Sequence, residues 1–119
     1  MHDYKKLNVW SESIKIASII YEITMRFPKE EQFGLTSQMR RCAVSIASNI
    51  AEGSGRNNPN EFNHFLGYAI GSSFELETQL ILANGLGFCN ETDFNNLMEK
   101  LIVCQKMLFK LQQSLKINK

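Results

Sequence analysis

One spacing in the sequence is typical of metal-binding helical bundles. Glu61 and His64 stand three residues apart, as in the Glu-x-x-His motifs with which bundles hold di-iron or di-manganese centres. Such a centre needs a second motif of this kind and two further inward carboxylates, yet the only other histidine is His2. We therefore expect no metal site, and interpret Glu61 as a first-turn acid that favours the positive end of a helix dipole.

The cysteines offer neither a disulfide framework nor a catalytic nucleophile. Their number, three, is odd, and no C-x-x-C occurs. Cys42 and Cys104 stand beside or within apolar stripes, where a thiol packs as a small hydrophobe, and no histidine lies near Cys89 in the sequence. A Gly-rich phosphate loop of the G-x-x-x-x-G-K type is also missing. We expect no enzymatic activity and no cofactor.

Polar residues recur in two stripes with helical spacing. The first consists of Gln38, Arg41, Ser45, Asn49, Glu52 and Arg56, and the second of Tyr68, Ser72, Glu75 and Gln79. Such stripes can be solvated faces, can hydrogen-bond across a helix or subunit interface, or can line a ligand groove. The spacing leaves these three alternatives open for the stripes; for Asn49 and Glu52 we expect burial and pairing.

Charge is distributed unevenly, although the net charge is only +1. Residues 57–99 contain six acids and no Lys or Arg, whereas residues 100–119 contain five Lys and no acid. A near-neutral total therefore hides a dipolar chain, and it does not exclude a polyanionic ligand. The candidate cations for nucleic-acid binding are Lys5, Lys6, Arg40, Arg41, Arg56, Lys106, Lys110 and Lys116.

Four blocks of helical periodicity position these residues. They cover about residues 7–27, 36–53, 59–84 and 91–116, and the last has an uninterrupted 3,4 repeat from Phe94 to Leu115. Short connections between helices of this length predict an all-α fold, an up-down-up-down four-helix bundle in a single domain over 1–119. No apolar run is long enough for a membrane span and no signal peptide is evident, so we expect a cytoplasmic protein.

Helix ends are marked by residues with known capping preferences. Pro28 ends the first block. Thr36 or Ser37 is a candidate N-cap for the second, Asn58 followed by Pro59 for the third, and Asn90 or Thr92 for the fourth. Gly53-Ser54-Gly55 is expected to stop the second helix with a positive φ. Gly67 and Gly71 lie inside the third helix, where close approach of another helix would offset their cost.

Several runs carry a family resemblance. They are QMRRCAVSIASNIAEGSGR over residues 38–56, Phe62-Asn63-His64-Phe65-Leu66, Ala69, Gly71-Ser72 and the run from Glu75 to Leu80, together with Leu7, Val9-Trp10, Tyr21 and Phe27-Pro28 near the start. The chain resembles the four-helix-bundle family of intervening-sequence proteins, whose reading frames lie inside insertions in bacterial 23S ribosomal RNA genes. It is also similar to the accessory variability proteins of diversity-generating retroelements.

The resemblance implies a ring-like homopentamer with an RNA-binding role and no catalysis. The family signature falls on Arg40, Arg41, Ser45, Asn49, Glu52, Gly53 and Arg56, and in the next helix on Ser72, Glu75 and Gln79. Apolar residues beside the main stripes, among them Ile19, Met98, Ile102 and Phe109, also favour self-assembly. We expect a non-enzymatic homo-oligomer whose partner is RNA or an RNA-handling protein; the alternative is a protein-interaction scaffold without a nucleic-acid ligand.

Overall fold

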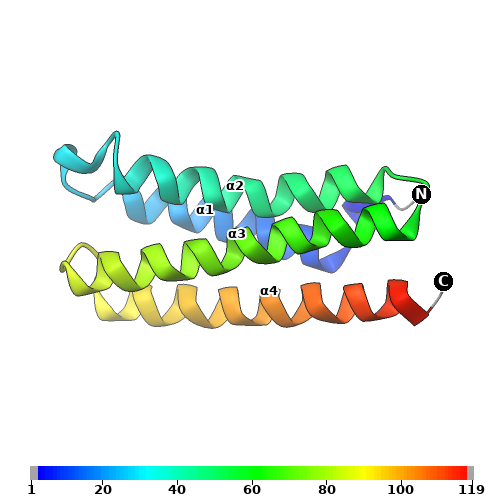
Figure 1. Cartoon of the computed structure of the whole chain (residues 1–119). Coiled ribbons are helices and arrows are strands. Elements are labelled where there is room, and N and C mark those ends of the chain that lie inside the picture. Colours follow the sequence, from blue (N-terminus) through cyan, green and yellow to red (C-terminus); the bar gives the residue numbers. More distant parts are fainter. Residues whose placement is uncertain (1–2, 118–119) are drawn as a thin grey trace.

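Four long helices run antiparallel to their neighbours in the computed structural model, which describes residues 3–117 (Figure 1). The elements in chain order are η1 (Tyr4–Lys6), α1 (Asn8–Thr24), η2 (Lys29–Glu31), α2 (Leu35–Ser54), α3 (Pro59–Gly85) and α4 (Glu91–Ile117). The expected all-α, up-down-up-down bundle is confirmed, and residues 3–117 contain no strand. No helix in this range combines the length and the apolar character needed to cross a membrane.

The core follows the apolar spacing of the sequence. Leu97, Leu101, Cys104 and Leu108 on α4 are fully buried, as the 3,4 repeat predicts. They belong to one cluster with residues of the other three helices, including Ile16, Ile20, Ile46, Leu76 and Leu80. The wide apolar face of α1 divides in two, because Ile16, Ile20 and Ile23 enter the core while Ile14 and Tyr21 remain exposed.

Helix α1 ends at Thr24 and is shorter than the expected block over 7–27. The amides of Arg26 and Phe27 bond to carbonyls three residues back, so the chain tightens before Pro28 instead of continuing the α-helical ladder. The Thr24 hydroxyl also donates to the Ile20 carbonyl at 2.6 Å.

Two of the predicted caps are confirmed and one is wrong. The side-chain oxygens of Asn58 and Asn90 each accept an amide hydrogen, from Asn60 and Asp93 respectively, both at 2.7 Å. Thr36 and Ser37 do not cap α2, which begins at Leu35 after Gly34. Because Gly34 has no side chain to offer, the carboxylate of Glu31 accepts the Leu35 amide at 3.1 Å and also meets the positive helix end.

The predicted glycine stop of α2 is also corrected. Gly53 and Ser54 lie inside the helix and are buried, and Gly55 has a φ of −80°, so no positive φ is used there. Gly53 instead lets α3 approach, since an added Cβ would lie 2.7 Å from the Cβ of Phe65. Gly71 behaves differently: nothing lies within 4 Å of an added Cβ, so within residues 3–117 no helix covers it.

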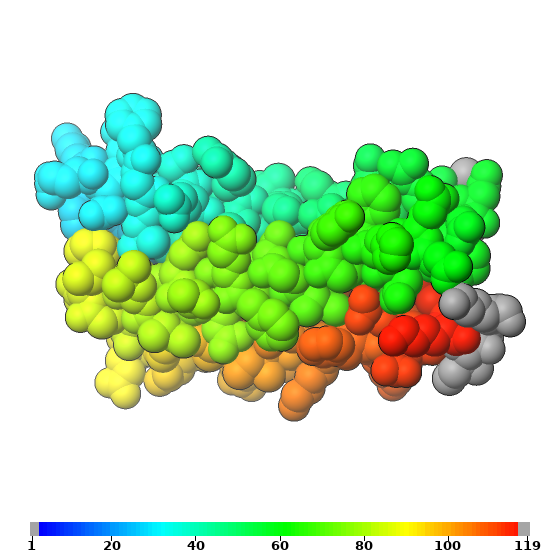
Figure 2. Space-filling model, viewed as in Figure 1, coloured from blue at the N-terminus to red at the C-terminus, as the bar shows by residue number. Residues whose placement is uncertain are grey.

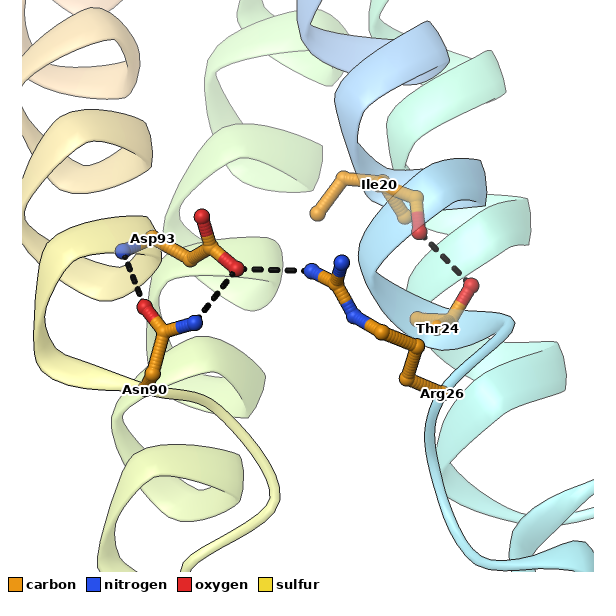
Figure 3. A network of polar contacts seen from close by, with 5 residues as sticks. All are labelled: Ile20, Thr24, Arg26, Asn90 and Asp93. Atoms are coloured by element: carbon orange, nitrogen blue, oxygen red, sulfur yellow. Dashed lines mark hydrogen bonds and ion pairs between the residues drawn. The ribbon is translucent and has the colours of Figure 1, made fainter.

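The two ends of the bundle differ in what they join. Both termini and the connection between α2 and α3 lie at one end, and the other two connections lie at the opposite end (Figure 1). At that second end Arg26 reaches Asp93 at 2.7 Å, and Asn90 donates to the same carboxylate at 3.1 Å (Figure 3). This network ties the chain after α1 to the start of α4, beside the contact between the rings of Phe27 and Phe88.

Candidate nucleic-acid interface

Five of the eight predicted cations gather at the end of the bundle that holds the termini. They are Lys5 and Lys6 of η1, Arg56 after α2, and Lys110 and Lys116 on α4, and all five side chains are exposed. A groove of about 400 Å³ brings Lys110 and Ser114 beside Leu7 and Asn8, which directly follow the η1 lysines. A second hollow places Lys116 beside Pro59 and Asn60, at the start of α3. We call these five residues the basic end.

Part of the positive charge at this end is neutralised. Arg56 pairs with Glu52 at 3.3 Å, as the helical spacing of the two residues predicts, and its guanidinium lies 4.9 Å from the centre of the Phe65 ring. Asp3 accepts the amide of Lys5 at 3.2 Å and caps η1. Lys106 is exposed on α4, one turn before Lys110.

Arg40 and Arg41 lie near the opposite end, so the predicted cations do not form a single surface. Both belong to the first half of α2, beyond the reach of the η1 lysines. The Nε of Arg40 donates to the Thr24 hydroxyl at 2.9 Å, and its guanidinium lies 4.6 Å from the centre of the Tyr21 ring. Arg41 is exposed, and it forms no ion pair with any residue that the structure describes.

The two polar stripes meet within the chain at their centre. The hydroxyls of Ser45 on α2 and Ser72 on α3 are 3.0 Å apart, and the Asn49 amide donates to the carbonyl and the hydroxyl of Ser45 at 2.9 and 3.0 Å. Ser45 and Ser72 therefore form a helix–helix contact, and Asn49 bonds to Ser45 from the next turn of α2. The expectation that Glu52 is buried is wrong: its side chain is exposed and pairs with Arg56, because the buried side of the last turns of α2 is that of Ile50, Gly53 and Ser54.

The remaining stripe residues separate by burial. Glu75 is exposed on α3, whereas Gln79 is buried with its Oε1 lacking a hydrogen-bond partner among the described residues.

The three cysteines have thiols that are hard to ionise. Cys42 lies close to Glu75 and Gln79, and burial, followed by the charge of Glu75, raises the pKa of its thiol. Burial raises the pKa of Cys104 to about 12. Cys89 is half-buried, and burial again raises the pKa of its thiol. Thiols of this kind are poor nucleophiles at neutral pH.

The Glu61 and His64 pair lies in the first two turns of α3, with both side chains exposed. Residues 3–117 contain no group of three potential metal ligands, and His2 lies outside the described residues. The pair therefore has no partner ligands in the part of the chain that the structure describes.

The sequence interpretation did not single out Phe33. It stands in the connection between α1 and α2, which protrudes from the body of the bundle at one end (Figure 2, cyan). Its ring is 91% exposed. The available signal was local, because Phe33 is the only apolar side chain between Lys29 and Gly34.

Comparison with known proteins supports the fold. The sequence model of the 23S rRNA-intervening sequence protein family matches residues 5–110. No curated protein matches the chain. A crystal structure of a protein of unknown function from the S23 ribosomal protein family of Bacteroides thetaiotaomicron superimposes with a TM-score of 0.79 at 20% identity, over 87% of this chain and 97% of that one. At this identity the likeness shows a shared fold.

Proposed function

Because the chain belongs to the 23S rRNA-intervening sequence protein family, we propose that it is a non-catalytic, homo-oligomeric RNA-binding protein. The observation that carries the proposal is the basic end, where three separate parts of the chain contribute cations. None of its four lysines forms an ion pair within residues 3–117, so their charges are available to an external anion.

The chemistry of the basic end suits a phosphate backbone. Lysine ammonium groups on flexible stems act as mobile point charges, and they release condensed counterions when they neutralise phosphates. Asp3, Glu52 and Glu61 offset part of the positive charge at the basic end. Other acids lie away from it, since Glu75, Glu77, Glu91, Asp93 and Glu99 are on the second half of α3 or the first half of α4. A polyanion is therefore drawn to one end of the bundle, with little dependence on base sequence.

Self-assembly strengthens such binding. Four cations and one internally paired arginine give weak attraction in a single subunit, but an oligomer repeats the basic end. Multivalent attachment of this kind raises apparent affinity by about 10²–10⁴ without new contacts. A ring of five subunits, as the resemblance implies, presents five such ends. Assembly and RNA binding are thus parts of one function.

Salt-dependent retention of a single-stranded RNA on filters tests the proposal. The native protein should bind at about 50 mM salt and lose most of its affinity by about 200 mM. A Lys110→Gln/Lys116→Gln variant should bind more weakly. Its salt slope should be smaller by about 1.4 for each subunit that contacts the strand, because each lost phosphate contact on single strands removes about 0.7.

The matched control removes the same charge elsewhere. Lys29→Gln/Lys100→Gln alters two lysines that lie away from the basic end, on η2 and in the first half of α4. It should leave the salt slope close to that of the native protein. Equal slopes for both double variants would contradict an RNA site at the basic end. No retention at low salt would favour the alternative function, a protein-interaction scaffold.

A further inference from the structure

A pocket with aromatic and arginine side chains lies at the end of the bundle opposite the basic end. Its volume is about 390 Å³, within the range of pockets that hold small ligands. Helix α1 contributes Tyr21, the connection contributes Gln32 and Phe33, and α2 contributes Ser37, Arg40 and Arg41. None of these residues belongs to the basic end.

The backbone on both sides of Phe33 is held by hydrogen bonds, although its ring is in solvent. On one side the Gln32 amide donates to the Lys29 carbonyl, and on the other the Gly34 amide donates to the Glu31 carbonyl, both at 3.0 Å. The Gly34 carbonyl in turn accepts the amide of Gln38 at 3.0 Å, which joins this turn to the first turn of α2. Phe33 thus presents a bare aromatic face from an ordered, hydrogen-bonded turn.

The arginines beside it have different roles. The bonds of Arg40 to Thr24 and to the Tyr21 carbonyl, together with its stacking on the Tyr21 ring, fix its guanidinium as part of the pocket wall. Arg41 is exposed and unpaired among the described residues, so its donors are available to a phosphate. Two acids belong to the same turn: Glu31 already accepts the amide of Leu35, and Glu30 is exposed and does not line the pocket.

We propose that this pocket binds one unstacked base of single-stranded RNA, with the base against Phe33 and the adjoining phosphate on Arg41. The inference rests on the proposed RNA-binding function and specifies its ligand as unpaired RNA. Exposed aromatic rings beside arginines are how proteins hold bases of single strands, because every base has a π-face. Bases in a duplex are stacked on their neighbours and are unavailable to Phe33. The pocket therefore discriminates single strands from duplexes, whereas the basic end attracts both.

Fluorescence anisotropy with two labelled probes tests this, a single-stranded oligoadenylate of about ten nucleotides and an RNA duplex of the same length. Phe33→Ala should weaken binding of the single strand at least about fivefold, since each base stacked on an aromatic side chain contributes at least that factor. Binding of the duplex should not change. Phe33→Trp should retain the affinity, and stacking of the base should quench the added tryptophan emission.

Met25→Ala is the matched control, because it also removes an exposed apolar side chain near this end, 77% exposed, but one without a π-face. It should bind both probes like the native protein. If Phe33→Ala binds the single strand as the native protein does, the pocket proposal is overturned while RNA binding by the basic end stands. A changed oligomer mass for Phe33→Ala in light scattering, with RNA affinity unaltered, would show that Phe33 contacts protein and would also overturn it. Failure of the native protein to bind either probe at low salt would instead contradict the proposed function itself.

Discussion

At the scale of single residues, position 53 requires glycine because α3 approaches closely there, which its place near a helix end does not reveal. An added Cβ would lie 2.7 Å from the Cβ of Phe65 and 2.9 Å from Cδ1 of Phe62. The Cβ of Phe65 is fixed to the α3 backbone and cannot turn aside, so the two helices would have to separate. We expect Gly53→Ala to lower the free energy of unfolding by about 1–3 kcal/mol, measured by urea denaturation.

Gly55 provides the control for this substitution. It follows α2 directly, has a φ of −80°, and an added Cβ would meet only ordinary contacts, 3.5 Å from the Glu52 carbonyl. Gly55→Ala should therefore change the stability by no more than about 0.5 kcal/mol. Equal losses for the two variants would contradict the close approach of α2 and α3 at Gly53.

Asn49 and Glu52 belong to the same polar stripe of the sequence, but the structure places them in different environments. Asn49 is half-buried and donates twice to Ser45, whereas Glu52 is exposed and meets only Arg56. Asn49→Ala should cost about 1 kcal/mol in stability, because its two hydrogen bonds to Ser45, the residue that meets Ser72 of α3, are lost. Glu52→Ala should cost less than about 0.5 kcal/mol, as exposed ion pairs do. The denaturation midpoints of the two variants, compared with the native one, measure the difference.

At the scale of helices, the sequence predicts where a helix begins and which side of it is buried, wherever that helix's own residues decide these features. The 3,4 repeat from Phe94 to Leu115 predicted the buried side of α4, and Asn58 before Pro59 predicted the start of α3. The sequence does not predict a cap or a close contact that a second segment of the chain provides. Glu31, from the preceding turn, caps α2, and the glycine at 53 serves the approach of α3 instead of a turn. Contacts between segments leave no periodic trace in either segment alone.

The candidate site follows the same logic. Single residue types predicted which side chains are cationic, but the antiparallel order of the helices decides which of them meet. Lys5 and Lys116 are far apart in the sequence and lie at the same end, whereas Arg41 on α2 and Arg56 just after it are closer in the sequence and lie at opposite ends. The spacing from Arg41 to Arg56 therefore suggests one ladder of cations, whereas the fold places these cations near two opposite ends of the bundle.

The start of α4 offers a test at this scale. Asn90 caps the helix through the amide of Asp93, and the Asp93 carboxylate also meets the exposed Arg26 (Figure 3). Asn90→Ala should lower stability by about 1 kcal/mol, as the loss of a helix cap does. Arg26→Ala should cost less than about 1 kcal/mol, and its cost should shrink at high salt, because exposed ion pairs are screened. Urea denaturation at low and high salt separates the two contributions; a salt-dependent loss for Asn90→Ala equal to that for Arg26→Ala would contradict this division.

At the scale of the whole molecule, one face remains uncovered by the chain's own helices. Phe74 on α3 and Phe109 on α4 are each nearly half exposed, with ring centres 6.4 Å apart, and Ile81 and Ile102 lie exposed on the same two helices. Gly71, one turn before Phe74, has open space above it. An apolar face of this kind on a small domain is typical of a protein–protein interface, and glycine allows a partner helix to come close. The opposite face, between α1 and α2, exposes Ile14 and Val44, so a head-to-tail ring has two different faces to join.

We therefore expect the native protein to have a mass several times 13.6 kDa in light scattering at micromolar concentration, and a Phe109→Lys variant to have a smaller one. Lysine at position 109 would put an unpaired charge in the apolar contact between subunits, which opposes association. Met25→Lys makes the same chemical change at an exposed position away from this face and should leave the mass unaltered. Because position 109 is exposed in the single subunit, the variant should still fold, and helical circular dichroism checks this. A native mass near 13.6 kDa, or a folded Phe109→Lys variant of native mass, would contradict an interface between α3 and α4.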